Sequence, residues 1–209
     1  MLDVIFKLAL AYVLGSIMGS LLLGRYRGVD IRMSGSGNAG GTNALRTQGK
    51  GFALGVMVID VGKGWLAAAV VPALTFVSDM PPPVWLAYAC GAAAVIGHVF
   101  PLFYGFRGGK GAATLVGTLL CYAPVLVLPL LVVFILTIML TGYVGLATIV
   151  TTEAAMIAVA AVYQLDRLPL LIYAAVMSIV IIWTHRSNIM RMMNGTESRN
   201  TKMMVLRRQ

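Results

Sequence analysis

The sequence has few charged residues, and acidic residues are fewer than basic ones. Only 11% of its 209 residues are Asp, Glu, Lys or Arg, and 7 of those are acidic. A soluble domain typically has about 25% charged residues. The hydrophobic share is 59% and the mean hydropathy is +0.89. These values exclude an ordinary soluble domain, and they also exclude disordered, collagen-like and coiled-coil chains.

Cysteine is nearly absent, with Cys90 and Cys121 both inside apolar stretches. Their spacing matches no metal-ligand pattern, so the sequence argues against a disulfide framework and against a zinc site. The 16 basic residues leave a net charge of +9. In a soluble protein this excess would suggest nucleic acid, but cytoplasmic loops of membrane proteins are also rich in Lys and Arg. No nucleic-acid partner is therefore expected.

Long apolar runs dominate the chain, and a transmembrane helix needs about 20 such residues. The first run leads into Gly24-Arg25-Tyr26-Arg27 without an Ala-x-Ala cleavage signal at its end, so we interpret it as a retained span and not as a signal peptide. The pattern predicts an all-α, polytopic integral membrane protein that forms a single membrane-embedded domain over residues 1–209. The apolar segments are 2–23, 52–77, 84–104, 112–140, 143–163 and 168–184.

Three polar stretches, 25–51, 105–111 and 185–209, carry most of the basic residues. The positive-inside bias therefore predicts that all three face the cytoplasm and that the N-terminus lies outside. An odd number of crossings is then required, although only six apolar segments are present. The segment 112–140 would form a helix of about 43 Å, longer than a hydrocarbon core of about 30 Å.

Proline at position 124 offers a break within this long segment, because proline interrupts helices. We predict a short helix over about 110–122 and a second over about 124–140. The result is about seven transmembrane helices, with the N-terminus outside and the C-terminus cytoplasmic. A re-entrant half-helix at 110–122 is the alternative, and it would leave the number of crossings unexplained.

The first polar stretch contains a glycine-rich run with interleaved hydrogen-bond donors. Glycine permits positive φ angles and close approach of a ligand to the backbone, and successive N–H groups in such loops form anion-binding nests. Arg46 adds a planar group suited to phosphate. A flexible Gly/Ser linker is the alternative, but a linker does not require these polar side chains. The candidate residues are Gly35, Ser36, Gly37, Asn38, Thr42, Asn43 and Arg46.

The second stretch holds Gly108, Gly109, Lys110 and Gly111 directly before a predicted helix start. A lysine there can bind an anion together with the helix N-terminus. The alternative is a positive charge that only sets topology. His98, near the end of the preceding helix, is more typical of a structural residue.

The third stretch begins with His185 and Asn188, which share a face if the last helix continues past Trp183. Arg191 would follow one turn later. A polar helix end with snorkelling arginines is the alternative interpretation.

Asp60, Lys63 and Glu153 lie deep inside predicted spans, where ionisable residues are costly and usually paired or functional. Asp60 and Lys63 stand three positions apart, so pairing between them is slightly favoured over catalysis. Glu153 has no partner nearby in the sequence. The roles of all three are left open.

Taken in order, these motifs resemble the bacterial acyl-phosphate-dependent glycerol-3-phosphate acyltransferases over nearly the whole chain. Gly35-Ser36-Gly37-Asn38 with Thr42-Asn43 and Arg46 is similar to the first family motif. Gly97-His98 through Gly108-Gly109-Lys110-Gly111 is similar to the second. His185, Asn188-Ile189, Arg191 and Gly195-Thr196-Glu197 are similar to the third, and Asp60-Val61-Gly62-Lys63-Gly64 resembles the family's second helix.

The resemblance implies a multi-pass enzyme of the bacterial inner membrane with its active site near the cytoplasmic face. It would transfer a long-chain acyl group from acyl phosphate to the sn-1 hydroxyl of glycerol 3-phosphate, and release lysophosphatidic acid and phosphate. Members of the family use neither acyl-CoA nor acyl carrier protein as the direct acyl donor, and they need no metal. The resemblance therefore implies that this protein has no metal and no cofactor. By residue match, the catalytic positions are Ser36, Arg46, Lys110, His185 and Asn188. The positions expected to bind substrate or phosphate are Gly35, Gly37, Asn38, Thr42, Asn43, Gly108, Gly109 and Gly111.

No His-x-x-x-x-Asp pattern follows either histidine, since Phe103 and Met190 occupy the fifth positions. We therefore hypothesise that substrate phosphate takes up the proton while His185 binds or orients. An organophosphate transporter is the main alternative, although transporters commonly show repeats and midplane binding. A non-catalytic scaffold would have no use for such loops. Acyl-chain preference and oligomeric state are left open.

Overall fold

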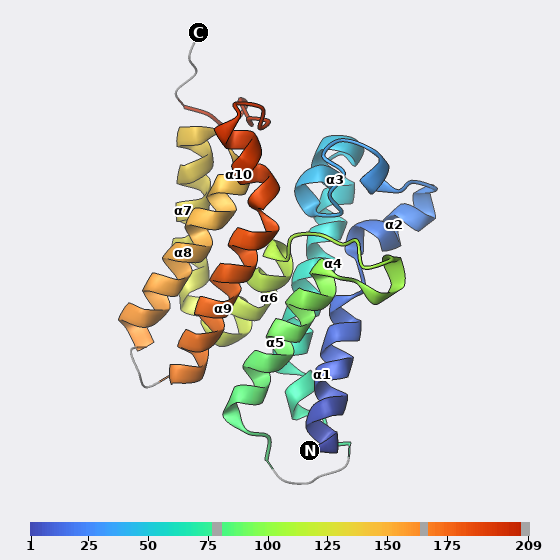
Figure 1. Ribbon diagram of the computed structural model, residues 1–209, viewed down its shortest axis with the longest axis vertical. Helices are drawn as coiled ribbons and strands as arrows, with labels where there is room; N and C mark the ends of the chain where they lie inside the picture. The colour runs from blue at the N-terminus through green and yellow to red at the C-terminus, as the bar shows by residue number, and fades with distance from the viewer. Residues whose placement is uncertain (77–80, 164–166, 206–209) are drawn as a thin grey trace. The chain divides into compact units, whose positions relative to one another are not determined.

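The described residues, 1–76, 81–163 and 167–205 of a computed structural model, form α-helices and short 3-10 turns joined by loops. They divide into two compact units, Met1–Tyr122 and Ala123–Gln209 (Figure 1). Four helices are long and apolar enough to cross a membrane, or up to six spans if each bent helix pair is one span. The predicted all-helical membrane architecture is therefore confirmed, whereas the single domain stays a prediction. Residue 77 of the second apolar segment and residues 206–209 of the third polar stretch lie outside the described residues.

The described residues of the first unit form six α-helices. They are α1 (Leu2–Gly15), α2 (Gly19–Arg27), α3 (Gly41–Gln48), α4 (Lys50–Ala69), α5 (Val84–Val99) and α6 (Ala112–Tyr122), with 3-10 turns η1 (Ile31–Met33), η2 (Val71–Ala73) and η3 (Leu102–Tyr104). The second unit holds α7 (Pro124–Thr141), α8 (Val144–Tyr163), α9 (Leu168–Thr184) and α10 (Arg186–Met193).

The predicted split of the long apolar segment is present. The helix α6 ends at Tyr122, and α7 begins at Pro124 after Ala123 leaves helical geometry at φ −149° and ψ 62°. Proline is tolerated at the first helical position because that residue needs no N–H partner. Pro129 lies inside α7 without ending it.

The first apolar segment differs from the expectation of one continuous span. It forms α1 and α2, bent by 45° at a break over Ser16–Met18. Backbone groups freed by a break must find partners where water is absent. Here Lys63 Nζ donates to the Ile17 carbonyl at 2.7 Å, and Asp60 Oδ1 accepts the Gly19 N–H at 3.2 Å. The reason for the break therefore lies in a helix about 40 residues downstream.

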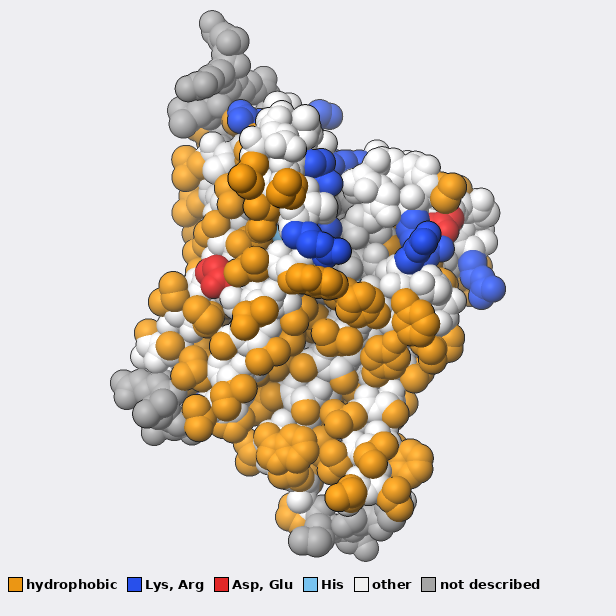
Figure 2. Space-filling model, in the orientation of Figure 1, with side chains coloured by type: hydrophobic (Ala, Val, Ile, Leu, Met, Phe, Trp, Pro, Cys, Tyr) orange, Lys and Arg blue, Asp and Glu red, His pale blue; other side chains and the backbone are white. Residues whose placement is uncertain are grey.

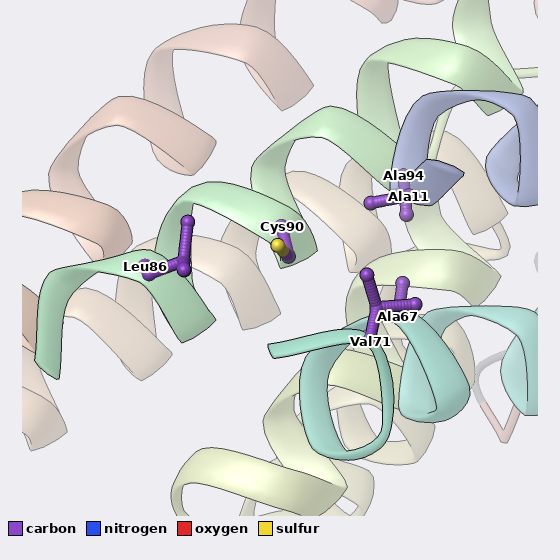
Figure 3. Packing of buried hydrophobic residues seen from close by; sticks show 6 residues of the cluster. All are labelled: Ala11, Ala67, Val71, Leu86, Cys90 and Ala94. Carbon is purple, nitrogen blue, oxygen red and sulfur yellow. The ribbon is translucent and has the colours of Figure 1, made fainter. Parts of the chain in front are cut away.

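Small residues allow the helices of the first unit to pack closely. Its core includes Ala11 of α1, Ala94 and Cys90 of α5, and Ala67 of α4, and the two alanines Ala11 and Ala94 lie side by side (Figure 3). In this unit, Lys and Arg side chains gather at the end that carries α2 and α3, and hydrophobic side chains cover α1 and α5 (Figure 2). The polar loops thus occupy one end of an otherwise apolar surface.

Glycines make the tightest contact, between α4 and α6. A Cβ at Gly64 would lie 2.1 Å from the Thr114 carbonyl oxygen, and one at Gly117 would lie 2.0 Å from the Val61 carbonyl oxygen. Such small-residue contacts are a common way for membrane helices to associate. The two helices consequently meet backbone to backbone.

We expect Gly117→Ala to destabilise the protein by about 1–3 kcal/mol, because the added methyl group forces the two backbones apart. Thermal unfolding of purified protein in detergent measures the loss. Gly62→Ala on α4 is the matched control, since a Cβ there meets no heavy atom within 4 Å. Equal midpoints for the two variants would contradict the close-packing interpretation.

Candidate active site

The first glycine-rich loop connects α2 to α3, and the side chain of Asn43 holds its shape. Asn43 Oδ1 accepts the Ser36 N–H at 2.9 Å, and Nδ2 donates to the carbonyls of Ile31 and Ser34 at 2.8 and 3.1 Å. Gly35 adopts φ +62°, and a Cβ there would lie 2.2 Å from Asn43 Oδ1. The amide of Asn43, a predicted substrate ligand, is thus engaged in folding the loop.

The other predicted residues of this loop lie around that buried amide. Ser36, Gly37 and Thr42 are exposed, Asn38 is half-buried, and Arg46 is exposed on the last turn of α3. The Asn38 amide nitrogen lies against Gly40, where a Cβ would be only 2.8 Å away. The loop therefore presents hydroxyl, amide and guanidinium groups at its surface while Asn43 fixes the backbone beneath them.

The second glycine-rich loop folds back onto the end of α5. The Gly108 N–H donates to the Val99 carbonyl at 3.2 Å, and the Gly109 N–H donates to the His98 carbonyl at 3.1 Å. These two N–H groups shape the loop and are not available to an anion. Gly111 adopts φ +87°, and its carbonyl accepts the first bond of α6 from Leu115.

Lys110 stands two residues before the start of α6 at Ala112, so a helix begins just after this lysine as predicted. The first N–H groups of a helix have no partner within the helix, and the helix dipole favours an anion there. The arrangement can therefore place a lysine and a helix N-terminus beside the same anion.

Arg32 ties the two loops together within the first unit. Its Nη1 donates to the Tyr104 and Arg107 carbonyls, each at 3.1 Å, and its Nη2 pairs with Asp30 Oδ2 at 2.7 Å. Hydrogen bonding from Arg32 holds the pKa of Asp30 below its usual value. Sequence reasoning did not single out Arg32, because the two carbonyls that it contacts at the second loop are more than 70 positions away in the sequence.

A buried cluster lies beneath the second loop and was only partly predicted. Lys63 Nζ lies 2.9 Å from Asp60 Oδ1, which confirms the expected pairing. It also lies 2.9 Å from His98 Nδ1. The interpretation of His98 as a structural residue agrees with this buried position, but its contact with the ion pair was not foreseen.

The third polar stretch belongs to the second unit. The last helix does not run straight through His185 as the shared-face argument assumed, because α9 ends at Thr184 and α10 follows after a bend of 52°. Asn188 still follows one turn later, since its N–H bonds to the His185 carbonyl at 2.8 Å. His185 Nδ1 lies 2.8 Å from the Ile181 carbonyl, so Nδ1 carries a proton and Nε2 is the acceptor nitrogen of the neutral ring.

Glu197 organises the polar residues that follow His185. Its Oε1 accepts from Asn188 Nδ2 at 2.9 Å, and its Oε2 accepts from Arg191 Nε at 2.6 Å. Sequence reasoning quoted Glu197 in the third motif but gave it no role, because the turn at Gly195 that brings it back is not visible in residue spacing. A buried carboxylate between two donors fixes both of them.

Glu153 also has a partner within the second unit. The Ser178 hydroxyl of α9 donates to Glu153 Oε1 of α8 at 2.5 Å. The partner stands 25 positions away in the sequence, which explains why a search for a neighbour found none. An ionisable residue inside an apolar helix is thus hydrogen-bonded between two helices.

The fold and these loops define a helical integral membrane protein whose polar loops gather groups that bind anions. Residues 5–195 match the family profile described as Glycerol-3-phosphate acyltransferase. The chain belongs to this glycerol-3-phosphate acyltransferase family of integral membrane enzymes.

Individual relatives agree with the family match. A glycerol-3-phosphate acyltransferase of Geobacter sulfurreducens is 42% identical, with 95% of this chain and 98% of the relative covered. The glycerol-3-phosphate acyltransferase of Chlorobaculum parvum is 40% identical, with 96% of this chain and 98% of the relative covered. The crystal structure of PlsY (YgiH), an integral membrane glycerol 3-phosphate acyltransferase in its glycerol 3-phosphate form, has a TM-score of 0.83 at 35% identity, with 94% of each chain covered. Its lysophosphatidic acid form has a TM-score of 0.81.

We expect Arg32→Lys to raise the KM for glycerol 3-phosphate roughly fivefold, since about 1 kcal/mol of carbonyl hydrogen bonding between the loops is lost. Lysine keeps the charge but lacks the planar fork. Steady-state kinetics measure the change, and Arg25→Lys, at an exposed position of α2, is the control. An unchanged KM for Arg32→Lys would show that the tie between the loops has no effect on binding.

The Asp30–Arg32 pair also predicts a pH dependence. The pKa of Asp30 is lowered in the folded protein by its hydrogen bonds with Arg32. The contribution of the pair to stability is therefore complete above the pKa of an aspartate in the unfolded chain, about 3.9. That contribution is lost as the pH falls through the lower, folded value. The stability difference between wild type and Asp30→Asn should therefore be constant above about pH 5 and decrease only below about pH 4. A difference that changes between pH 6 and 8 would contradict this assignment.

Proposed function

We propose that this protein transfers a fatty acyl group from acyl phosphate to the sn-1 hydroxyl of glycerol 3-phosphate. The products are lysophosphatidic acid and inorganic phosphate, and the reaction is the first acylation of phospholipid synthesis. The observation that carries the proposal is the pair of joined loops in the first unit. One loop presents Ser36 and Arg46, and the other places Lys110 near the N-terminus of α6. The similar crystal structures are a glycerol 3-phosphate form and a lysophosphatidic acid form of their enzyme.

The chemistry of the substrates explains why such loops are needed. Both substrates carry phosphate, so the site must supply cationic and N–H donors for two anions. Acyl phosphate is a mixed anhydride whose phosphate leaves once its charge is stabilised. Holding the acceptor hydroxyl beside the acyl carbonyl supplies much of the remaining rate acceleration.

We assign the reaction to Ser36, Arg46, Lys110, His185 and Asn188. Substrate and phosphate binding is assigned to Gly35, Gly37, Asn38, Thr42, Asn43, Gly108, Gly109 and Gly111. Because their described hydrogen bonds go to the protein, Asn43, Gly108 and Gly109 would act by shaping the loops. The direct phosphate donors are then the exposed side chains, Lys110 and the N–H groups that begin α6.

The acceptor hydroxyl must lose a proton during the reaction. The described hydrogen bonds of Glu197 run to Asn188 and Arg191, so this carboxylate is engaged in holding the loop. We propose that substrate phosphate takes up the proton and that His185 binds or orients a substrate through Nε2. The fixed Nδ1–H bond to Ile181 would hold the ring in place for this role.

The membrane topology is also a proposal. We infer seven spans, with the short α6 counted as one and each bent pair as one. The positive-inside bias of the three polar stretches then supports an N-terminus outside, a cytoplasmic C-terminus and an active site near the cytoplasmic face of the bacterial inner membrane.

The first test is formation of labelled lysophosphatidic acid from palmitoyl phosphate and radiolabelled glycerol 3-phosphate by purified protein. We expect product with wild type, and a loss of at least about 100-fold in Lys110→Ala, as for other stabilising charges in active sites. Lys50→Ala, an exposed lysine at the start of α4, is the control. Well-folded wild type that forms no product from palmitoyl phosphate or from palmitoyl-CoA would refute the proposal and direct attention to organophosphate flux.

The proton hypothesis predicts the pH–rate profile of His185→Gln. If His185 only binds or orients, the variant loses activity at every pH while the shape of its profile matches wild type. Measurement of kcat from pH 5 to 9 tests this expectation. Disappearance of an ionisation in the histidine range would instead identify His185 as the general base.

A further inference from the structure

The cluster of Asp60, Lys63 and His98 is the most deeply buried group of ionisable side chains in the described first unit. Their exposed fractions are 0%, 3% and 2%. Asp60 and Lys63 come from α4, and His98 comes from α5 (Figure 1). None of the three was placed among the substrate-binding residues. They contact the break between α1 and α2, which precedes the first loop, and the end of α5, which precedes the second.

The hydrogen bonds of Lys63 determine the proton position on His98. A lysine ammonium has three donors and no acceptor. Lys63 Nζ contacts the Ile17 carbonyl at 2.7 Å, Asp60 Oδ1 at 2.9 Å and His98 Nδ1 at 2.9 Å. The three donors are thereby used, and His98 Nδ1 must be an acceptor. The neutral ring then carries its proton on Nε2.

That Nε2 atom lies directly beneath the second loop. A Cβ at Gly109 would be only 2.2 Å from it, so the ring supports the loop at a position where any side chain would collide with it. The His98 carbonyl holds the same residue from the other side of the backbone, by accepting the Gly109 N–H at 3.1 Å. His98 therefore contacts Gly109, the neighbour of Lys110, twice.

The cluster also reaches the first loop. Asp60 Oδ1 accepts the Gly19 N–H at the start of α2. The next residue, Ser20, donates its hydroxyl to the Ala39 carbonyl at 2.5 Å, inside the first glycine-rich loop. The ion pair is therefore linked to both loops. Asp60 is linked to the first loop through Gly19 and Ser20, and Lys63 is linked to the second through His98.

The pair is a poor source of stability, which suggests that its importance is geometric. Asp60 Oδ2 is buried and has no hydrogen-bond partner among the described residues. An unmet carboxylate oxygen is costly, and a buried ion pair replaced by well-packed apolar residues is often no less stable.

We infer that His98 is a positioning residue, held by the Asp60–Lys63 pair, that sets the height of the Gly108–Gly111 loop for glycerol 3-phosphate. It acts through Gly109 and does not touch the substrate. This inference rests on the proposed function. Its specific consequence is that loss of the ring impairs substrate binding more than the chemical step.

The first experiment compares His98→Asn with wild type, as full-length protein in bilayers. Asparagine retains an acceptor near Nδ1 for Lys63 but removes the part of the ring beneath Gly109. We expect the KM for glycerol 3-phosphate to rise about tenfold, which corresponds to about 1.4 kcal/mol, with kcat reduced less than about threefold. Should His98→Asn fail to fold, His98→Ala, which also removes the ring from beneath Gly109, is measured, with the same direction expected.

Lys7→Met is the matched control for general destabilisation. Lys7 forms another buried ion pair of the first unit, with Asp3 at 2.7 Å on α1. This variant should lower the unfolding midpoint and leave the KM for glycerol 3-phosphate unchanged. A His98→Asn enzyme with a lowered midpoint and an unchanged KM would overturn the inference and make the cluster merely structural.

A double-mutant cycle tests the contact itself. Gly109→Ala alone should raise KM, because its methyl group meets the His98 ring. In Gly109→Ala with His98→Asn the ring is absent, so the combined rise in KM should be smaller than the product of the two single effects. Effects that multiply would overturn the inference.

Gly108→Ala provides the matched cycle. A Cβ there would meet the His98 backbone carbonyl at 2.0 Å, which no change of the His98 side chain can relieve. When Gly108→Ala is combined with His98→Asn, the rises in KM should therefore multiply.

The proposed function and the positioning role can be refuted separately. If wild type forms no lysophosphatidic acid, the proposed function is refuted. If wild type is active and His98→Asn has an unaltered KM, only the positioning role is refuted.

Discussion

The fold of the first unit depends on one requirement, that backbone groups exposed by a broken helix must find partners inside a membrane. The break between α1 and α2 exposes the Ile17 carbonyl and the Gly19 N–H, and a lysine and an aspartate of α4 bind them. A charged pair in an apolar helix would otherwise be unfavourable. Its two charges neutralise each other, and together they hold a bend that directs the chain toward the first glycine-rich loop.

In both glycine-rich loops, the residues that give the loop its shape are different from those that are accessible to a substrate. Asn43 ties the first loop from below, and the end of α5 ties the second through its carbonyls. Glu197 has the same role for Asn188 and Arg191 in the second unit. A phosphate-binding loop needs such support, because a donor placed about 1 Å from its proper position loses most of its effect. Glycine-rich sequence therefore does not imply a flexible segment here.

Features set by local sequence were predictable, and those set by distant partners were not. Pro124 marked the break between α6 and α7, the glycines before Ala112 marked a helix start, and the i,i+3 spacing of Asp60 and Lys63 marked an ion pair. The break at Ser16–Met18 was missed because its partners lie on α4. The contacts of His98, Glu153 and Arg32 were missed for the same reason, since residue spacing carries no information about which helices meet. The assignments of individual substrate ligands stay predictions, because they were drawn from motif resemblance.

The glycine contacts between helices have a further consequence, which concerns conformational entropy. Where Gly15 meets Ala94 and Gly97 meets Tyr12, the opposing atoms are backbone atoms, as they are between α4 and α6. Freezing a long side chain costs up to about 2 kcal/mol of rotamer freedom, whereas glycine has none to lose. These helix pairs therefore associate without immobilising side chains at the closest point of contact. Their relative register is set by the backbone alone, and it does not depend on which rotamers the surrounding lipid-facing residues adopt.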